Sequence, residues 1–281
     1  MNTRTDVFSA KDMGDGVIRI STTGSVYCYL VLGTKRAALV DAMSGLGNLR
    51  LFVETLTDLP IALLLTHCHF DHIGGAMDFR EAWISPDDSG LIAEQNQNVK
   101  KYWYEKTHMR HRKGAEIAFT PRDFTPEHPI IWRALTEGRE FDLGGRTLTA
   151  AALAGHTAGS LGFIDSRTHG FFSGDAGSRY TFLFLQASTT CAAYHENLKR
   201  FKSLYGNSVA KWYNAHMDDE MPASIIDDLI QCSVDGAEGR VAGPKFRTTD
   251  GKIRFVSPTD RHWKRADGRF GNIIVNTDKL A

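Results

Sequence analysis

The sequence has no excess of charge of either sign, because Lys plus Arg and Asp plus Glu both number 33 and the formal net charge is +0. A chain without net charge gives no electrostatic reason to expect a nucleic-acid or membrane partner. No segment approaches the ~18 apolar residues of a membrane span, and residues 1–20 lack the apolar run of a signal peptide. We therefore expect a cytoplasmic protein without a membrane or nucleic-acid partner.

Cysteine is scarce, and Cys28, Cys68, Cys191 and Cys232 form no CxxC pair. Widely spaced cysteines in a chain without an export signal indicate free thiols. Internal repeats and low-complexity tracts are also missing, so the sequence does not indicate a repeat protein. With 281 residues, 42% hydrophobic and 23% charged, the composition is typical of a globular protein. We predict a single domain over residues 1–281.

Two hydrophobic patterns alternate along the chain and predict a mixed α/β protein. Helical spacing of apolar residues predicts helices at Gly45–Thr57, Cys191–Leu204 and Pro222–Cys232. Short apolar runs predict strands at Val17–Ile20, Tyr27–Leu32, Ala37–Val40, Ile61–Leu65, Ile130–Leu135, Arg146–Leu153, Leu161–Asp165, Gly170–Phe172, Lys211–Asn214, Lys252–Val256 and Asn272–Val275. The third predicted helix, Pro222–Cys232, begins at a proline, which suits the first turn of a helix.

Residues from about 95 to 129 differ from the rest, being rich in charge, histidine and aromatic side chains. We interpret them as an insertion, partly helical before Gly114 and loop-like after it. Tyr102, Trp103 and Tyr104 could form a lid over an apolar ligand, and a satellite core or a homodimer contact is an equal alternative. Residues from about 222 to 281 are interpreted as a C-terminal extension of the same domain.

The segment Thr66–His72 reads THCHFDH and follows a predicted buried strand. Side chains alternate along an extended chain, so His67 and His69 can project to the same side. Asp71 and His72 then lie in the turn towards the next helix. Imidazole and carboxylate groups suit zinc, and sites of this kind that keep an open position are catalytic. The segment therefore predicts a metal site, and one short loop can supply two adjacent metal positions.

Three further candidates each follow a predicted strand: His156 in AGHTAGS, Asp175 in FSGDA and His216 in YNAH. A single histidine or aspartate at a strand end is usually a cap or turn residue. Here glycines flank His156 closely and precede Asp175, and they allow the backbone bends that bring a side chain to a shared centre.

The order HxHxDH, GHTxGS, SGD and a late histidine resembles the metallo-β-lactamase superfamily of hydrolases over roughly residues 15–220. The resemblance implies an α/β (α+β) fold, a four-layer αββα sandwich with the metals at one edge between the sheets. It also implies the ligands: His67, His69 and His156 for the first zinc, Asp71, His72 and His216 for the second, and Asp175 as the bridge. Asp41 matches a structural aspartate that orders the metal loops.

By the same resemblance, two zinc ions about 3.5–4 Å apart would share a hydroxide that attacks a carbonyl carbon. Asp71 and Asp175 are then catalytic carboxylates, and Asp71 can also take or relay the proton. Iron or manganese could fill the same ligands, but His69 stands where di-iron redox members usually carry a carboxylate. Ala158 replaces a proline common in the third motif, and Cys68 should point away from the metals into the core.

The substrate is less clearly indicated. We predict hydrolysis of a small-molecule carboxylic ester, lactone or thioester; the alternatives are a phosphodiesterase or nuclease of the same fold and a mononuclear-iron sulfur dioxygenase. Tyr180 is a candidate for the substrate carbonyl, because lactonases of the family use a tyrosine soon after the bridging aspartate. His195 and the basic tail could contact an anionic substrate or simply form a solvated surface.

Overall fold

The computed structural model describes residues 3–22, 26–95, 97–109, 117–216, 220–246 and 252–280. The chain divides into two compact units. The first comprises Met1–Ala150 with Asp165–Thr168, and the second comprises Ala151–Ile164 with His169–Ala281. The predicted single domain over 1–281, with its insertion and C-terminal extension, stays a prediction.

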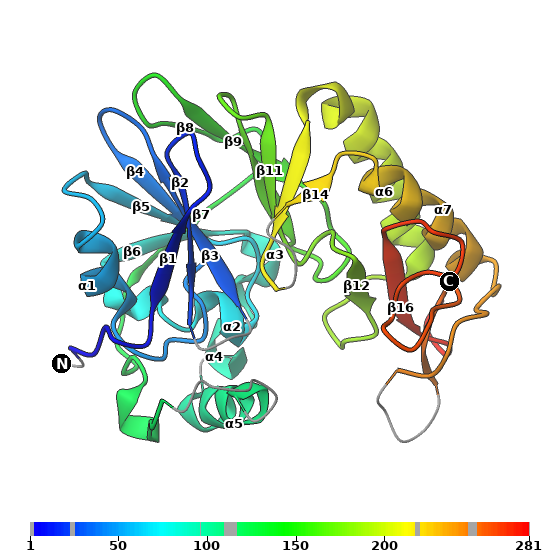
Figure 1. Ribbon diagram of the computed structural model, residues 1–281, viewed down its shortest axis with the longest axis horizontal. Helices are drawn as coiled ribbons and strands as arrows, with labels where there is room; N and C mark the ends of the chain where they lie inside the picture. Colours follow the sequence, from blue (N-terminus) through cyan, green and yellow to red (C-terminus); the bar gives the residue numbers. More distant parts are fainter. Residues whose placement is uncertain are drawn as a thin grey trace. The chain divides into compact units, whose positions relative to one another are not determined.

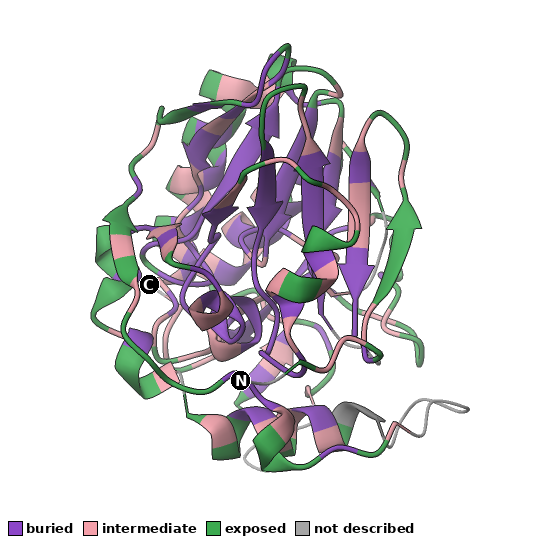
Figure 2. Ribbon diagram, turned by 90° about the vertical axis from the view of Figure 1, so that its left-hand side faces the viewer, coloured by how far each residue is buried: buried purple, intermediate pink, exposed green. Residues whose placement is uncertain are grey.

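A seven-stranded sheet forms the centre of the first unit (Figure 1), and its strands β1 to β7 pair in chain order. Its strands are β1 (Ser9–Asp12), β2 (Val17–Ser21), β3 (Tyr27–Leu32), β4 (Ala37–Val40), β5 (Ile61–Leu64), β6 (Glu81–Ile84) and β7 (Ile131–Ala134). The strands from β1 to β4 are antiparallel, and those from β4 to β7 are parallel. The central strands are buried and β1 is exposed (Figure 2). The carboxyl ends of β4, β5 and β6 therefore meet at one edge.

Short helices connect the parallel strands. They are α1 (Leu49–Glu54), α2 (Phe70–Ile73), η1 (Ala76–Asp78), α3 (Pro86–Ser89), α4 (Ile92–Gln95), α5 (Asn98–Met109) and η2 (Pro121–Asp123). The helix predicted over Gly45–Thr57 is wrong in its first turn, because Gly45 and Gly47 have φ of 84° and 81°. These left-handed residues cannot lie in a right-handed helix. The side chain of Asn48 then caps α1 by accepting a hydrogen bond from the Leu51 N–H.

The chain passes from the first unit to the second within β9 (Thr147–Ala152), whose start pairs with β8 (Glu140–Asp142). In the second unit β14 (Met221–Pro222), β13 (Lys211–Asn214), β11 (Gly170–Gly174) and β10 (Leu161–Asp165) lie in that order. A separate three-stranded sheet has the order β12 (Tyr180–Leu183), β16 (Asn272–Asn276), β15 (Ile253–Phe255). The helices are α6 (Cys191–Tyr205), η3 (Gly206–Ser208) and α7 (Ile225–Ala237).

The core of the second unit joins α6 and α7 to β11 and β13 through buried side chains such as Tyr194, Leu198, Phe171 and Trp212. The helix predicted over Pro222–Cys232 begins later and ends later, as α7. Its predicted first residue instead lies in β14, where it pairs with the start of β13. The sequence pattern also missed the short strands β1, β6, β8, β12 and β14.

Within the insertion, Tyr102 on α5 packs edge-on against Phe119 at 5.7 Å and joins a small buried cluster of the first unit. This supports the satellite-core interpretation for Tyr102. Trp103 is 58% exposed, and Tyr104 packs against Phe70 at 5.0 Å. A lid role for the insertion stays a prediction, and its residues 110–116 lie outside the described ranges.

The four cysteines are free, as predicted, and all four are buried. Burial raises the pKa of the Cys68 thiol, and the nearby Asp88 carboxylate adds to the shift. Cys68 is thus a core residue, which confirms the interpretation from alternation. In the described part of the chain, every helix is too short or too polar to cross a membrane.

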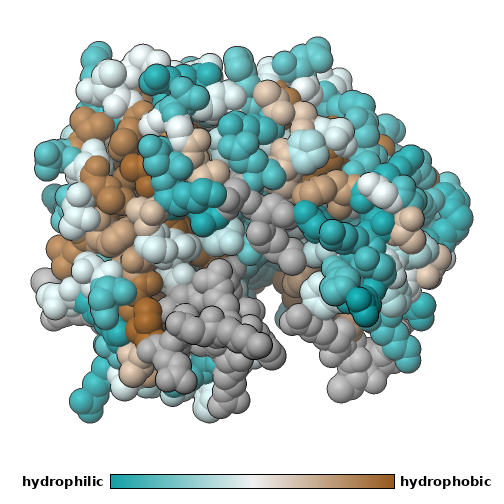
Figure 3. Space-filling model, in the orientation of Figure 1, coloured by the Kyte–Doolittle hydropathy of each residue, from teal (hydrophilic) through white to brown (hydrophobic). Residues whose placement is uncertain are grey.

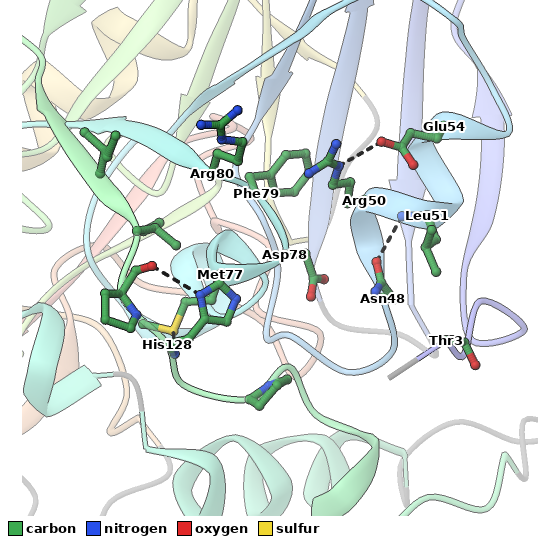
Figure 4. A pocket seen from close by; sticks show the side chains of 14 residues that line it. Thr3, Asn48, Arg50, Leu51, Glu54, Met77, Asp78, Phe79, Arg80 and His128 are labelled. Carbon is green, nitrogen blue, oxygen red and sulfur yellow. Dashed lines mark hydrogen bonds and ion pairs between the residues drawn. The ribbon is translucent and has the colours of Figure 1, made fainter. Parts of the chain in front are cut away.

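Apolar side chains gather on the surface of the first unit, on the left of Figure 3. A cavity of about 920 Å³ in this unit is lined by Leu51, Met77, Phe79, His128 and Ile131, among others (Figure 4). The lining comes from α1 and from the segments around the starts of β6 and β7, and it includes none of the predicted metal ligands. The cavity is therefore separate from the candidate site.

Candidate metal centre

In the first unit, Asp41 organises the loop that carries four predicted ligands. Asp41 follows β4 directly, and Thr66 follows the neighbouring β5. The Asp41 carboxylate accepts hydrogen bonds from the Thr66 N–H (2.8 Å), the Thr66 hydroxyl (2.9 Å) and Nδ1 of His72 (2.8 Å). Asp41 is 2% exposed and has φ of 67°, an uncommon left-handed conformation for a residue other than glycine. These contacts agree with the structural role that the resemblance implies.

These hydrogen bonds also determine which imidazole nitrogen of His67 and of His72 can bind a metal. The Thr66 hydroxyl donates its proton to Asp41, so its oxygen accepts from Nδ1 of His67 at 3.1 Å. Nδ1 of His72 donates to Asp41 in the same way. In a neutral imidazole, a proton on Nδ1 leaves the lone pair on Nε2. His67 and His72 are therefore both prepared to bind through Nε2.

Nε2 of His67 lies 3.0 Å from Nδ1 of His69. Two nitrogens bound tetrahedrally to one zinc at about 2.0–2.1 Å lie roughly 3.3 Å apart. The observed separation is close to this value, so the pair fits a single metal position. The Asp88 carboxylate accepts from the backbone N–H of Cys68 at 2.9 Å and holds the short chain segment between these two histidines.

In the second unit, Asp175 and His216 follow the parallel strands β11 and β13 and so lie at the same edge of their sheet. The register of β11 shifts between Phe172 and Gly174, a bulge that redirects the following side chain. Oδ2 of Asp175 lies 3.1 Å from Nε2 of His216 and 3.5 Å from Nε2 of His156. Nδ1 of His156 donates to the carbonyl oxygen of Phe182 at 2.9 Å, again leaving Nε2 for a metal.

Each unit by itself therefore fits metal binding. The Nδ1 partners of three histidines are hydroxyl, carboxylate and carbonyl oxygens, which is how proteins orient metal-binding histidines. The ligand-to-ligand separations match those around a small divalent ion. The first unit carries four of the seven predicted ligands, His67, His69, Asp71 and His72, and the second unit carries the other three, His156, Asp175 and His216. That the sets of the two units bind shared ions stays a prediction.

Tyr194 on α6 braces both ligand loops of the second unit. Its hydroxyl donates to the carbonyl oxygen of Ala176 at 2.7 Å, next to Asp175. Its ring lies against Gly155, next to His156. The side chain of Asn197 donates to the Ala154 carbonyl at 2.8 Å. From the sequence alone these residues indicate only a helix, because nothing in their spacing shows that α6 packs on the loops.

Replacing Gly155 by alanine is expected to reduce activity about 100-fold and stability by about 1–3 kcal/mol. The new Cβ would lie 2.2 Å from Cδ2 of Tyr194, so the ring or the loop must move. Overpacking costs energy of this order, and a shift of about 1 Å in a reacting group can cost about 100-fold. Urea unfolding and kcat/KM measure the two effects.

Gly90→Ala is the matched control, because a Cβ at Gly90 meets nothing within 4 Å. It should leave both quantities unchanged. If Gly155→Ala and Gly90→Ala had the same free energy of unfolding and the same kcat/KM, Tyr194 would not confine the His156 loop.

Two buried ionisable residues of α5, Lys101 and Glu105, contact segments close to the predicted ligands of the first unit. Nζ of Lys101 donates to the carbonyl of Gly74 at 3.3 Å, and the Ser44 hydroxyl donates to Glu105 at 2.5 Å. Both side chains are almost fully buried. Burial lowers the pKa of Lys101 to about 8. Burial also raises the pKa of Glu105 to about 7, and the negative charge of Asp71 adds to that shift.

The free energy of unfolding of the metal-free protein should therefore fall as the pH rises from about 4.5 to about 7. In this range the folded protein keeps a proton on Glu105 that the unfolded chain, with its ordinary pKa of 4.5, has lost. The expected loss is about 3 kcal/mol. Glu105→Gln removes this contribution, so the difference between wild type and variant should decrease with pH. The free energies of unfolding come from urea titrations at several pH values. If those of wild type and Glu105→Gln changed in parallel with pH, the raised pKa of Glu105 would be contradicted.

Tyr180 and His195 have structural partners in the second unit. The Tyr180 ring is 7% exposed and packs against Phe255 and Trp263. Nδ1 of His195 lies 3.0 Å from the Ser233 hydroxyl. The substrate contact of Tyr180 stays a prediction.

A family model described as the metallo-beta-lactamase superfamily matches residues 21–215, more than half of the chain, so the chain belongs to this superfamily. The predicted fold class, the α/β (α+β) metallo-β-lactamase sandwich, is confirmed.

Several curated relatives are hydrolases. The chain is 29% identical over 182 residues to "Acyl-coenzyme A thioesterase MBLAC2" of Gallus gallus, covering 60% of this chain and 65% of the relative. It is 31% identical over 151 residues to "Probable metallo-hydrolase YqgX" of Bacillus subtilis, covering 52% and 64%. It is 30% identical over 149 residues to "Hydroxyacylglutathione hydrolase GloC" of Haemophilus influenzae, covering 50% and 61%. Each match spans less than two thirds of the relative.

Solved structures support the fold alone. A metallo-β-lactamase from Erythrobacter litoralis superposes with a TM-score of 0.55 at 15% identity, covering 84% of this chain and 100% of that one. A metallo-β-lactamase from Pontibacter korlensis gives a TM-score of 0.57 at 15% identity, covering 81% and 99%.

Proposed function

We propose that this chain hydrolyses acyl thioesters of small molecules, using two zinc ions. The observation that carries the proposal is the pair of prepared ligand sets, in which His67, His72 and His156 donate from Nδ1 and keep Nε2 for a metal. Two of the relatives named above are, by their names, an acyl-coenzyme A thioesterase and a hydroxyacylglutathione hydrolase. Both names denote thioester hydrolysis, which favours thioesters over the esters and lactones also predicted.

The predicted ligands would bind the two ions in two sets. We assign the first ion to the Nε2 atoms of His67 and His156 with His69, and the second to Asp71, His72 and His216. Asp175 would bridge them, and iron or manganese could replace zinc. When bound, the metals supply Lewis acidity towards the thioester carbonyl and lower the pKa of water towards neutrality.

Side chains of the protein would accept the proton and orient the metal ligands. Asp71, in the first turn of α2, would take the proton that the attacking water loses. Asp41 and Thr66 hold the rings of His72 and His67 in their binding orientation, so no reorganisation is needed during the reaction. The proposal includes a cytoplasmic location and a small-molecule substrate, with a homodimer as one alternative for the assembly.

Elemental analysis combined with a substrate screen tests the proposal. We expect about two zinc ions per chain, together with hydrolysis of acyl-coenzyme A and acyl-glutathione that stops on chelation and returns with zinc. Activity on bis(p-nitrophenyl) phosphate or RNA without thioesterase activity would replace the proposal by a phosphodiesterase. A single iron per chain with oxygen consumption would replace it by a dioxygenase.

A further inference from the structure

The three-stranded sheet of the second unit has two unlike faces. Alternation along β12 and β16 directs Leu183, Ile273 and Val275 to one face, where they join the core formed with α7. The opposite face carries Tyr180, Phe182 and Ile274. What contacts this second face therefore has to be identified. Its strands β12 and β16 are labelled in Figure 1.

Aromatic rings dominate the second face. Tyr180, Phe255, Ile253 and Ile274 form its buried base. Phe182, Phe184, Phe246 and Trp263 lie on the base and stay partly exposed. Among the described residues of this cluster, none belongs to a helix. An aromatic surface of this composition, without a charged member, favours contact with an apolar group.

The four partly exposed side chains form one continuous group, here called the aromatic surface. Ring centroids are 5.0 Å apart for Phe182 and Phe184, 5.3 Å for Phe182 and Phe246, and 5.5 Å for Phe246 and Trp263. These separations are those of rings in direct contact. The surface is therefore wide enough to contact several methylene groups at once.

The aromatic surface is continuous with the candidate metal centre. The carbonyl oxygen of Phe182 accepts the hydrogen bond from Nδ1 of His156. The Ser188 hydroxyl lies 2.8 Å from the His156 carbonyl and 3.4 Å from that of Phe182, so the two segments are tied at a second point. The backbone that carries Phe182 therefore contacts the predicted ligand His156 directly, within the same unit.

We propose that the aromatic surface binds the aliphatic acyl chain of the substrate, so that the enzyme prefers thioesters with medium-length or longer acyl chains to those of short hydroxy acids. The inference rests on the proposed function. It assigns specificity to Phe182, Phe184, Phe246 and Trp263, which lie in or beside β12 and in the C-terminal segment. Its physical basis is the transfer of methylene groups from water to an apolar surface.

The preference should be measurable as a chain-length dependence. Complete burial of one methylene contributes a factor of about four to binding. A surface that covers one side of the chain should give about half of that free energy, or roughly twofold per methylene. From a four-carbon to a ten-carbon acyl group, kcat/KM should rise on the order of 50-fold, and most of the gain should appear in KM.

The experiment measures kcat/KM of the zinc-loaded enzyme for acyl-coenzyme A substrates from two to twelve carbons. Phe246→Ala and Phe184→Ala should flatten the chain-length dependence while leaving the two-carbon substrate nearly unaffected. Phe246→Leu, which keeps the apolar contact, should retain most of it. Phe8→Ala is the matched control, because Phe8 is a partly buried ring of the first unit that packs on Phe52.

Trp263 provides a readout independent of turnover. S-dodecyl-coenzyme A, a thioether that cannot be hydrolysed, should change the fluorescence of the zinc-loaded protein, and Trp263→Phe should remove that change. Hydrolysis with equal kcat/KM at all chain lengths would overturn this inference and leave the proposed function standing. Absence of hydrolysis at any length would overturn the proposed function, and a Trp263 response would then still support the apolar surface. A dimer that dissociates in Phe246→Ala, with an unchanged chain-length dependence, would identify the surface as a dimer contact instead.

Discussion

Replacing Asp175 by alanine is expected to lower kcat/KM by at least about 1,000-fold and to reduce the number of zinc ions retained per chain. Oδ2 of Asp175 faces Nε2 of both His156 and His216, so its removal deletes the carboxylate that both histidines share. Metal ions supply several kcal/mol of transition-state stabilisation, and about 4 kcal/mol corresponds to 1,000-fold in rate. Steady-state kinetics and elemental analysis on the same preparation measure both effects.

Asp227→Ala is the matched control for this substitution. Asp227 also lies in the second unit, but it is exposed and pairs with Lys202 on the surface. Surface ion pairs contribute about 0–1 kcal/mol, so the control should keep its zinc and its activity. Full activity in Asp175→Ala would show that the second unit does not contribute this ligand.

Replacing Asp41 by alanine should weaken zinc binding about 10- to 100-fold and destabilise the metal-free protein by about 3 kcal/mol. The substitution leaves the Thr66 N–H and Nδ1 of His72 buried without their acceptor, and each such loss costs about 1–3 kcal/mol. It also frees the orientation of His72, and loss of such a partner typically costs 10- to 100-fold in metal affinity. Competition with a chelator and urea unfolding measure the two quantities.

Asp41→Asn separates geometry from charge at this position. Asparagine tolerates the left-handed backbone conformation and keeps one oxygen as an acceptor. It should therefore lose less stability and less zinc affinity than the alanine variant. If the alanine variant binds zinc as tightly as wild type, Asp41 does not orient the metal loop.

The sequence predicts much of this architecture because its strongest signals are local. The segment from Thr66 to His72, the glycine-flanked His156 and the glycine-preceded Asp175 could be located as candidates from the local sequence. Strands β10 and β13 have the predicted bounds, since each is a short apolar run between clear turns. Local patterns of this kind depend little on the rest of the fold.

Other features follow from packing and could not be located in this way. The bracing of two loops by Tyr194 depends on where α6 packs, and the contact of Glu105 with Ser44 joins residues 61 positions apart. β12 carries Tyr180 and Phe182, but it reads as an ordinary apolar segment until its pairing with β16 reveals an aromatic face. The left-handed Gly45 and Gly47 likewise show their effect on α1 only in the folded backbone.

The proposed function requires that residues of both units supply ligands for two metal ions. Its most direct test is the metal content of wild type, His67→Ala and His216→Ala, measured after saturation with zinc and removal of the excess. We expect about two zinc ions per wild-type chain and fewer in each variant, since one residue comes from each unit. Wild type that retains no metal, or variants that both retain two, would contradict the claim.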